Sequence, residues 1–379
     1  MSYTSTQVVS RPSSITSQYM PIKDITNPDP ASPFSSPFYR QHTLRPNNII
    51  VEDGQLDDER WSRQAFALGM PFGDVQRPNA EARKVAQKMQ RKQNLNEKQL
   101  VELLLPLVQS SAKSHKKLQV QTGNNFHHDA VPIGTFDQSS YTAWSMPLPV
   151  PKPDIAVGFT SKTFNSHELE LQEGIISNAH GEPCDLAKVS QPTRDVFWPF
   201  FVVEVQASLY AAQNAAAGSA STCNNALALL AEAADEPTIQ RQGRGISWQS
   251  RRAVQSFSLA VCGKTATLNL HNFQGGLSHC AAVIRSYKLD DESDMEALAS
   301  RLASILIWAE NCRLPTIVDL LENLDHMVQL ESRDYLSDAF TNENLVTVSN
   351  HDAGSPRKRF SGIKSRLAEI SPKWIRVQA

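Results

Sequence analysis

The stretch that decides the fold is Trp198–Ser208, WPFFVVEVQAS, in which six consecutive apolar residues precede a carboxylate, Glu204. A continuous apolar run is typical of a strand that is buried on both faces. Side chains alternate between the two faces of a strand, so the face with Phe200 and Val202 becomes polar at Glu204 and Gln206. An unpaired buried carboxylate costs several kcal/mol. We therefore expect Glu204 to be exposed, paired with a basic side chain or bound to a cation.

A second carboxylate has a similar setting earlier in the chain. The phrase PKPDIAVGF, residues 151–159, places Asp154 at the head of another apolar run. The sequence thus predicts two strands, Asp154–Phe159 and Phe200–Gln206, each with an acid near one end. The polar connection between them is long for a compact domain, so we expect it to hold local structure or a mobile flap.

Helical and strand patterns alternate through the middle of the chain. A capping signal at Asn96 and Gln99 introduces a run with helical spacing, and an Ala-rich stretch predicts a helix up to Glu232. Ser293 and Glu296 have capping-box spacing as well. Further strands are expected at Gln255–Cys262, Ala266–Leu270 and Ala281–Leu289, and further helices after Ser293 and over Thr316–Leu324. This order predicts a mixed α/β domain over residues 79–330.

Both ends of the chain have a different composition. Residues 1–78 are rich in Ser, Thr, Pro and Asn, which predicts a disordered arm, although residues 57–70 have the pattern of a short docking helix. Residues 331–379 are polar and become basic, with seven Lys or Arg after Pro356 against one acid. We expect a mostly disordered, solvated tail there, with nuclear import or contact with nucleic acid as the alternative.

Charge, hydropathy and cysteine content indicate which partners, which cellular compartment and which cysteine chemistry to expect. The chain of 379 residues has a net charge of −2, so total charge does not indicate a partner, but residues 79–117 carry nine Lys or Arg against three acids. That excess suits a DNA or RNA backbone, and equally an ordinary exposed helix surface. A membrane span and a signal peptide are not expected, which predicts an intracellular protein, nuclear or cytoplasmic and not secreted. Five scattered cysteines indicate reduced thiols and no zinc site.

The two acidic phrases together resemble a known motif. Pro153-Asp154 followed by Glu204-Val205-Gln206 resembles the pattern of the PD-(D/E)XK nuclease superfamily. The phrases PKPDIAVGF, FFVVEVQAS and SFSLAVCG are more closely similar to an uncharacterised family of fungal proteins assigned to that superfamily, over about residues 80–325. The resemblance implies an α/β fold with a restriction-endonuclease-like core, a mixed central sheet flanked by helices, between disordered N- and C-terminal arms.

The resemblance also implies roles for three residues. Asp154 and Glu204, with the main-chain carbonyl between Glu204 and Gln206, would supply hard oxygen ligands to Mg²⁺ or Mn²⁺. Such an ion polarises a scissile phosphate and lowers the pKa of a bound water. Gln206 stands where the pattern has Lys, so it would position water or phosphate as an uncharged donor. The implied catalytic residues are Asp154, Glu204 and Gln206.

Three functions follow as alternatives. The first is metal-dependent phosphodiester hydrolysis of DNA or RNA, and the second is a catalytically degenerate nuclease-fold domain that binds nucleic acid or protein. The third is a scaffold whose terminal arms recruit protein partners.

The histidines at two positions are not expected to bind metal or to catalyse a reaction. His127-His128 lies in an apparent loop without ligands at metal spacing, and His271 suits a structural role.

Overall fold

The computed structural model describes residues 32–70, 79–133, 146–177, 181–234, 254–274 and 278–343, apart from the side chains of Asp53 and residues 330–343. Its centre is a seven-stranded mixed sheet with the order β1-β9-β8-β7-β6-β3-β2. The strands are β1 (Ile49–Gln55), β2 (Leu118–Thr122), β3 (Ile155–Phe159), β6 (Phe197–Val205), β7 (Gln255–Cys262), β8 (Thr265–Gln274) and β9 (Ser278–Lys288). A separate two-stranded sheet pairs β4 (Ile175–Ser177) with β5 (Pro183–Asp185).

Strand direction follows the connections. β2, β3 and β6 are successive antiparallel neighbours, and β7 is parallel to β6 because a helix crosses over between them. β8 is antiparallel to both β7 and β9, and β1 is parallel to β9. The predicted mixed α/β arrangement, a central sheet with flanking helices, is therefore confirmed.

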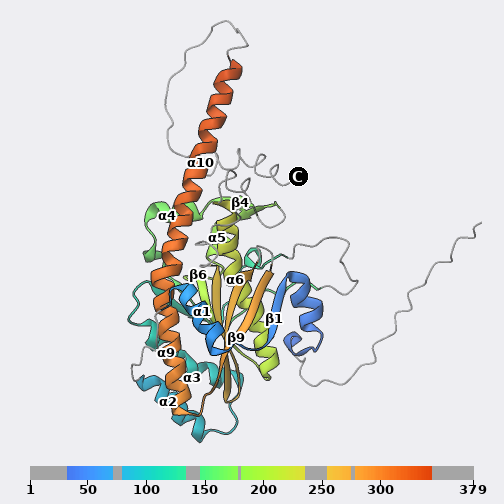
Figure 1. Ribbon diagram of the computed structural model, residues 1–379, viewed down its shortest axis with the longest axis vertical. Helices are drawn as coiled ribbons and strands as arrows, with labels where there is room; N and C mark the ends of the chain where they lie inside the picture. The colour runs from blue at the N-terminus through green and yellow to red at the C-terminus, as the bar shows by residue number, and fades with distance from the viewer. Residues whose placement is uncertain are drawn as a thin grey trace, which may run out of the picture. The chain divides into compact units, whose positions relative to one another are not determined.

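Helices cover both faces of the sheet (Figure 1). α6 packs against β6, β7 and β8, whereas α3 contacts β2 and β6 on the other side and α9 contacts β9. The α-helices are α1 (Asp58–Leu68), α2 (Ala80–Arg91), α3 (Glu97–Ala112), α4 (Ser166–Gln172), α5 (Leu186–Ser190), α6 (Leu209–Ala233), α9 (Glu292–Trp308) and α10 (Leu314–Glu343). Short 3₁₀ or π turns are η1 (Pro33–Ser35), η2 (Arg40–Leu44), η3 (Arg45–Asn47), η4 (His128–Ala130), η6 (Ser161–Thr163) and η7 (Ala309–Arg313).

The two sides of the sheet use side chains of different size. Small residues let α6 lie close to the strands, as in the cluster of Ala212 and Ala216 with Ala260 of β7. The opposite side is filled by large rings, among them Phe257 and Trp308, whose ring centroids are 5.2 Å apart in an edge-to-face arrangement. This asymmetry brings the α6 backbone, and any polar side chain on it, within reach of Glu204.

β6 does not alternate along its whole length as expected. Val202 packs towards α6, but the Phe200 ring lies 6.3 Å from that of Trp308 on α9. The pairing of β3 with β6 shifts between Val157 and Phe159, which marks a bulge. The predicted face shared by Phe200, Val202, Glu204 and Gln206 is therefore wrong for Phe200, whereas Val202 and Glu204 both contact α6.

Of the two helix caps expected from the sequence, one is confirmed and the other is wrong. Asn96 and Gln99 form both bonds of a capping box at the start of α3, as expected. At α9, by contrast, the N-cap is Asp291, whose side chain accepts from the Asp294 N–H, so the expected cap at Ser293 is wrong. The long connection between β3 and β6 holds α4, α5 and the β4–β5 pair, which confirms local structure.

The predicted disordered arm of residues 1–78 is wrong for residues 33–56, whereas the short helix expected within residues 57–70 is confirmed by α1. β1 pairs with β9, and α1 buries Trp61 beneath the guanidinium of Arg301, which lies 4.9 Å from the ring centroid. Composition suggested disorder because the apolar residues here are sparse, but β9, α9 and α6 bury several of them, among them Leu44, Ile49 and Trp61. The C-terminal boundary at 330 is also too early, since α10 continues to Glu343; residues 344–379 lie outside the described residues.

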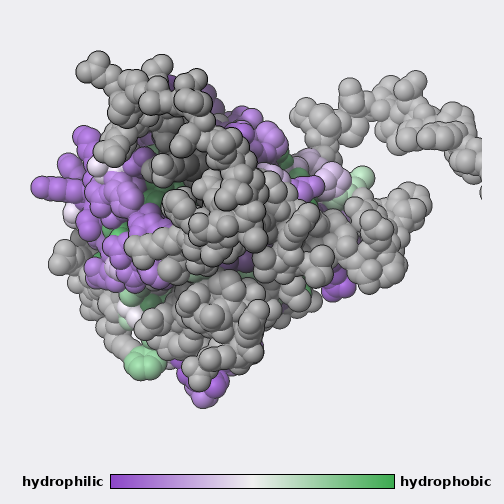
Figure 2. All heavy atoms as spheres, turned by 90° about the horizontal axis from the view of Figure 1, so that it is seen from above, coloured by the Kyte–Doolittle hydropathy of each residue, from purple (hydrophilic) through white to green (hydrophobic). Residues whose placement is uncertain are grey.

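Among the residues that are coloured in Figure 2, hydrophilic ones predominate and hydrophobic ones occupy small areas. Within the described ranges, none of the helices combines the length and apolar character needed to cross a bilayer.

Candidate functional site

Asp154 and Glu204 lie beside the same junction of two antiparallel strands. Ile155 of β3 pairs with Val203 of β6; Asp154 directly precedes Ile155, and Glu204 directly follows Val203. The Asp154 N–H donates to the carbonyl of Val203, the residue that pairs with Ile155, at 3.0 Å. The Asp154 side chain accepts from the Val205 N–H, next to Glu204, at 2.8 Å. The fold thus brings together the two acids that are fifty positions apart in the sequence.

Glu204 is a buried acid that accepts a hydrogen bond from an uncharged group. The residue is only 4% exposed, and the Ser219 hydroxyl of α6 donates to its Oε1 at 2.5 Å. Burial raises the pKa of Glu204 to about 8, the Ser219 bond opposes that rise, and the charge of Asp154 adds to it. The carboxyl group is consequently protonated over much of the neutral range in the metal-free protein.

Asp154 is partly buried and is held by the backbone of β6. Its Oδ2 accepts from the Val205 N–H at 2.8 Å. Burial raises the pKa of Asp154, the bond from Val205 lowers it, and the nearby charges of Glu97 and Lys152 act in opposite directions. One carboxylate oxygen therefore fixes the side chain at the junction of the two strands, next to Glu204.

Gln206 lies just beyond β6. Its N–H donates to the Val261 carbonyl at 3.0 Å, and its residue is half-buried. The structure thus positions Gln206 at the end of the strand that carries Glu204. Its side chain brings a neutral amide to this end of the sheet and no positive charge.

Two further residues of this region escaped the sequence analysis. Ser219 lies within the Ala-rich stretch that predicted only a helix, yet it is the donor to Glu204. Lys152 lies two positions before Asp154 in the phrase PKPD, and its charge lowers the pKa of Asp154. The proximity of Lys152 was visible in the sequence, whereas the position of Ser219 depends on how α6 packs.

The residues present fit a hard divalent cation. Asp154 and Glu204 offer carboxylate oxygens, and neither forms a salt bridge with a Lys, Arg or His within the described ranges. Mg²⁺ and Mn²⁺ prefer such oxygen ligands. Burial raises the pKa of Glu204 and the charge of Asp154 adds to that rise, so the ionised pair is costly by itself and a bound cation would offset that cost.

An N-terminal segment, residues 33–47, covers the side of α6 that is near this site. Arg40 donates to Asn214 at 2.8 Å and to Gln213 at 3.2 Å, and its guanidinium lies 4.6 Å from the Tyr210 ring centroid. Tyr39 is buried, and its pKa is raised by burial and by the charge of Glu204. Glu204 is therefore enclosed between the sheet, α6 and this segment.

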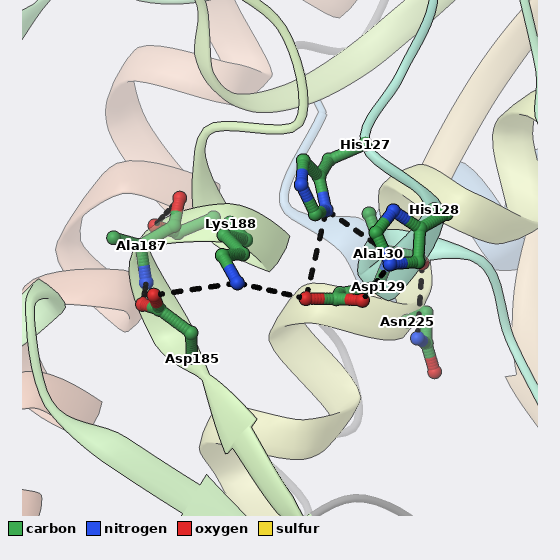
Figure 3. A network of polar contacts seen from close by, with 9 residues as sticks. His127, His128, Asp129, Ala130, Asp185, Ala187, Lys188 and Asn225 are labelled. Carbon is green, nitrogen blue, oxygen red and sulfur yellow. Dashed lines mark hydrogen bonds and ion pairs between the residues drawn. The ribbon is translucent and has the colours of Figure 1, made fainter.

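A second group of chemically active side chains lies in residues 127–129 (Figure 3). His127, His128 and Asp129 each offer a ligand atom, and these atoms lie within 4.8 Å of one another. The expectation that the two histidines lack ligands at metal spacing is wrong, because η4 turns Asp129 back towards them. His271 is buried, and its Nε2 lies 2.8 Å from the Ser258 hydroxyl, as a structural histidine would be.

The fold and these sites define a mixed α/β domain with paired acids on adjacent strands. The chain belongs to the family described as a domain of unknown function, DUF7924, whose model matches residues 84–321, more than half of the chain. No curated protein and no solved structure matches it.

Proposed function

We propose that the protein hydrolyses phosphodiester bonds of DNA or RNA in a metal-dependent reaction, on a restriction-endonuclease-like core. The observation that carries the proposal is the closeness of Asp154 to Glu204: Asp154 bonds to the N–H of Val205, its charge acts on Glu204, and neither acid forms a salt bridge among the described residues. Two acids in that arrangement are expected to share a divalent cation. The resemblance of their sequence phrases to the PD-(D/E)XK pattern supports the same conclusion.

Each residue has a proposed role. Asp154 and Glu204 hold Mg²⁺ or Mn²⁺, which when bound polarises the phosphate and lowers the pKa of a water. The Gln206 amide orients that water or donates to a phosphate oxygen. Lys152, exposed beside Asp154, supplies the positive charge that Gln206 lacks.

A second candidate is a nuclease-fold domain that binds nucleic acid or protein without cutting it. Two observations favour it: Gln206 carries no charge, and Glu204 is only 4% exposed beneath residues 33–47. An enclosed acid is accessible to a small cation more readily than to a phosphodiester.

A cleavage assay separates the two candidates. The full chain is incubated with single- and double-stranded DNA and RNA, with and without Mg²⁺ or Mn²⁺. For a nuclease we expect metal-dependent products, with activity lowered about 100-fold or more in Asp154→Asn and in Glu204→Gln. Glu102→Gln, which changes an exposed acid on α3, is the matched control and is expected to cleave normally.

Other outcomes favour different conclusions. Salt-sensitive binding of nucleic acid without products supports the second candidate. Normal cleavage by both acid variants contradicts the assignment of the site.

A further inference from the structure

The three-residue cluster at η4 has the geometry of a transition-metal site. The His128 Nε2 lies 2.8 Å from Asp129 Oδ1, and the His127 Nδ1 lies 3.6 Å from Asp129 Oδ2. Ligand bonds of about 2.0 Å at a tetrahedral angle imply ligand atoms roughly 3.3 Å apart. The two observed distances lie on either side of that separation and involve different oxygens of Asp129, and all three ligand atoms lie within 4.8 Å of one another. The His127 Nδ1 also accepts from the Asp129 N–H at 3.2 Å, so an ion bound to this nitrogen would replace that hydrogen bond.

The backbone of the cluster is held from both sides. The His127 N–H donates to the Pro192 carbonyl at 2.6 Å, and the Asn225 side chain of α6 donates to the Ala130 carbonyl at 3.0 Å. These bonds tie the turn to the segment before β6 and to α6, as Figure 3 shows for Asn225. Ligands on a restrained turn lose little entropy when an ion binds.

A cationic group already lies beside the cluster. Lys188 Nζ is 3.3 Å from Asp129 Oδ2 and 3.9 Å from Asp185 Oδ2, so it lies between two carboxylates (Figure 3). An ion bound to Asp129 would displace this ammonium, and Asp185 is positioned to keep it. Lys188 thus competes with a metal ion for Asp129 and can pair with Asp185 instead.

We propose that His127, His128 and Asp129 bind a divalent transition-metal ion of the zinc, cobalt or nickel class. Imidazole nitrogens suit these ions better than Mg²⁺, whereas the Asp154–Glu204 pair offers oxygen alone. Three protein ligands leave a coordination position for water. The residues beside Asp129 leave room for it, because Asp129, Glu182 and Cys184 line a pocket of about 210 Å³. This site is independent of the proposed nuclease chemistry.

A metal titration of the full chain tests the proposal. Zn²⁺ affinity is measured by competition with a chromophoric chelator, and Co²⁺ binding is followed by its visible absorption, both in excess Mg²⁺. We expect one ion per chain and a loss of affinity of about 10-fold or more in His127→Ala/His128→Ala. His167→Ala is the matched control, because His167 is another exposed histidine near an acid, Asp325 at 3.4 Å, and its loss should leave affinity unchanged.

Lys188→Gln gives a test that does not depend on losing ligands. Removing the competing ammonium should tighten Zn²⁺ binding several-fold, while Glu204→Gln should leave it unchanged. Thermal unfolding followed by circular dichroism checks that each variant is folded. Equal affinity in the wild type and the double histidine variant, or unchanged or weaker binding in Lys188→Gln, overturns the proposal.

Discussion

At the residue scale, the protonation of Glu204 links the candidate site to stability. Its pKa is about 8 in the folded protein against 4.5 in the unfolded chain. The folded state therefore binds the proton more tightly, and the free energy of unfolding falls as the pH rises from 4.5 to about 8. A tenfold difference in proton affinity corresponds to about 1.4 kcal/mol, so the loss amounts to a few kcal/mol.

Glu204→Gln should remove most of this pH dependence, because the amide has no proton to lose. We expect the variant to be more stable than the wild type at about pH 8 and similar to it at about pH 4.5. Urea unfolding at a series of pH values measures both. Parallel pH profiles for the two proteins would show that Glu204 is not buried as described.

Mg²⁺ should stabilise the protein by binding the ionised carboxylate of Glu204, so its stabilising effect should increase as the pH rises. A metal ion requires the ionised carboxylate, so binding must release the proton of Glu204. The rise in melting temperature caused by Mg²⁺ should accordingly be larger at about pH 8.5 than at about pH 6, and it should disappear in Glu204→Gln. A rise that is independent of pH and of this substitution would place the ion elsewhere.

Ser219 and Ser221 form a matched pair for testing the bond to Glu204. Both are buried on α6, but Ser219 donates to Glu204 while the Ser221 hydroxyl has no hydrogen-bond partner in the described part of the chain. Ser219→Ala should cost about 1–3 kcal/mol, since it leaves a buried acceptor without its donor. Ser221→Ala should be neutral or slightly stabilising, as measured by urea unfolding. Equal effects would mean that the hydroxyl bond contributes nothing.

At the element scale, a single buried side chain joins three elements. Arg313 in η7 donates to the carbonyls of Pro199 at 3.2 Å and Cys223 at 3.1 Å, and also to that of Gln255. These acceptors belong to β6, α6 and β7, the elements around the candidate site. The sequence offered no signal for this role, because an Arg after a helix resembles any surface residue.

Arg313→Ala should therefore destabilise the protein strongly, by about 3 kcal/mol or more, because it leaves buried carbonyls unsatisfied and opens a cavity. Arg285→Ala, which removes an exposed ion pair with Asp294 at 3.1 Å, should change stability by less than about 1 kcal/mol. Urea midpoints of the two variants provide the comparison. Similar losses would contradict the structural role assigned to Arg313.

At the scale of the whole molecule, the N-terminal segment completes a core that the family match does not include. Leu44, Ile49, Trp61 and Leu68 are buried, although they precede residue 84, where the match begins. A fragment of residues 79–343 should be less stable than one of residues 33–343 by several kcal/mol, since burying each such side chain contributes about 1.5–3 kcal/mol. The two urea midpoints measure this difference. Equal midpoints would show that β1 and α1 are dispensable.

The sequence by itself determined the features that rest on local patterns. The apolar runs of β3 and β6 and the capping box of α3 each depend on neighbouring residues, so the mixed α/β class and the two acids near strand ends were predictable. The extent of the terminal arms was not, because the burial of Trp61 depends on a partner more than two hundred residues away.

Only the tertiary structure decided which distant groups meet. Ser219 reaches Glu204 because the small residues of α6 let that helix approach the sheet, and Asp129 meets two histidines because η4 turns. Register and helix packing arise from contacts between remote segments, whereas hydrophobic spacing reports only the conformation of each segment. For that reason the sequence indicated which residues carry charge, and the fold determined which of those charges lie together.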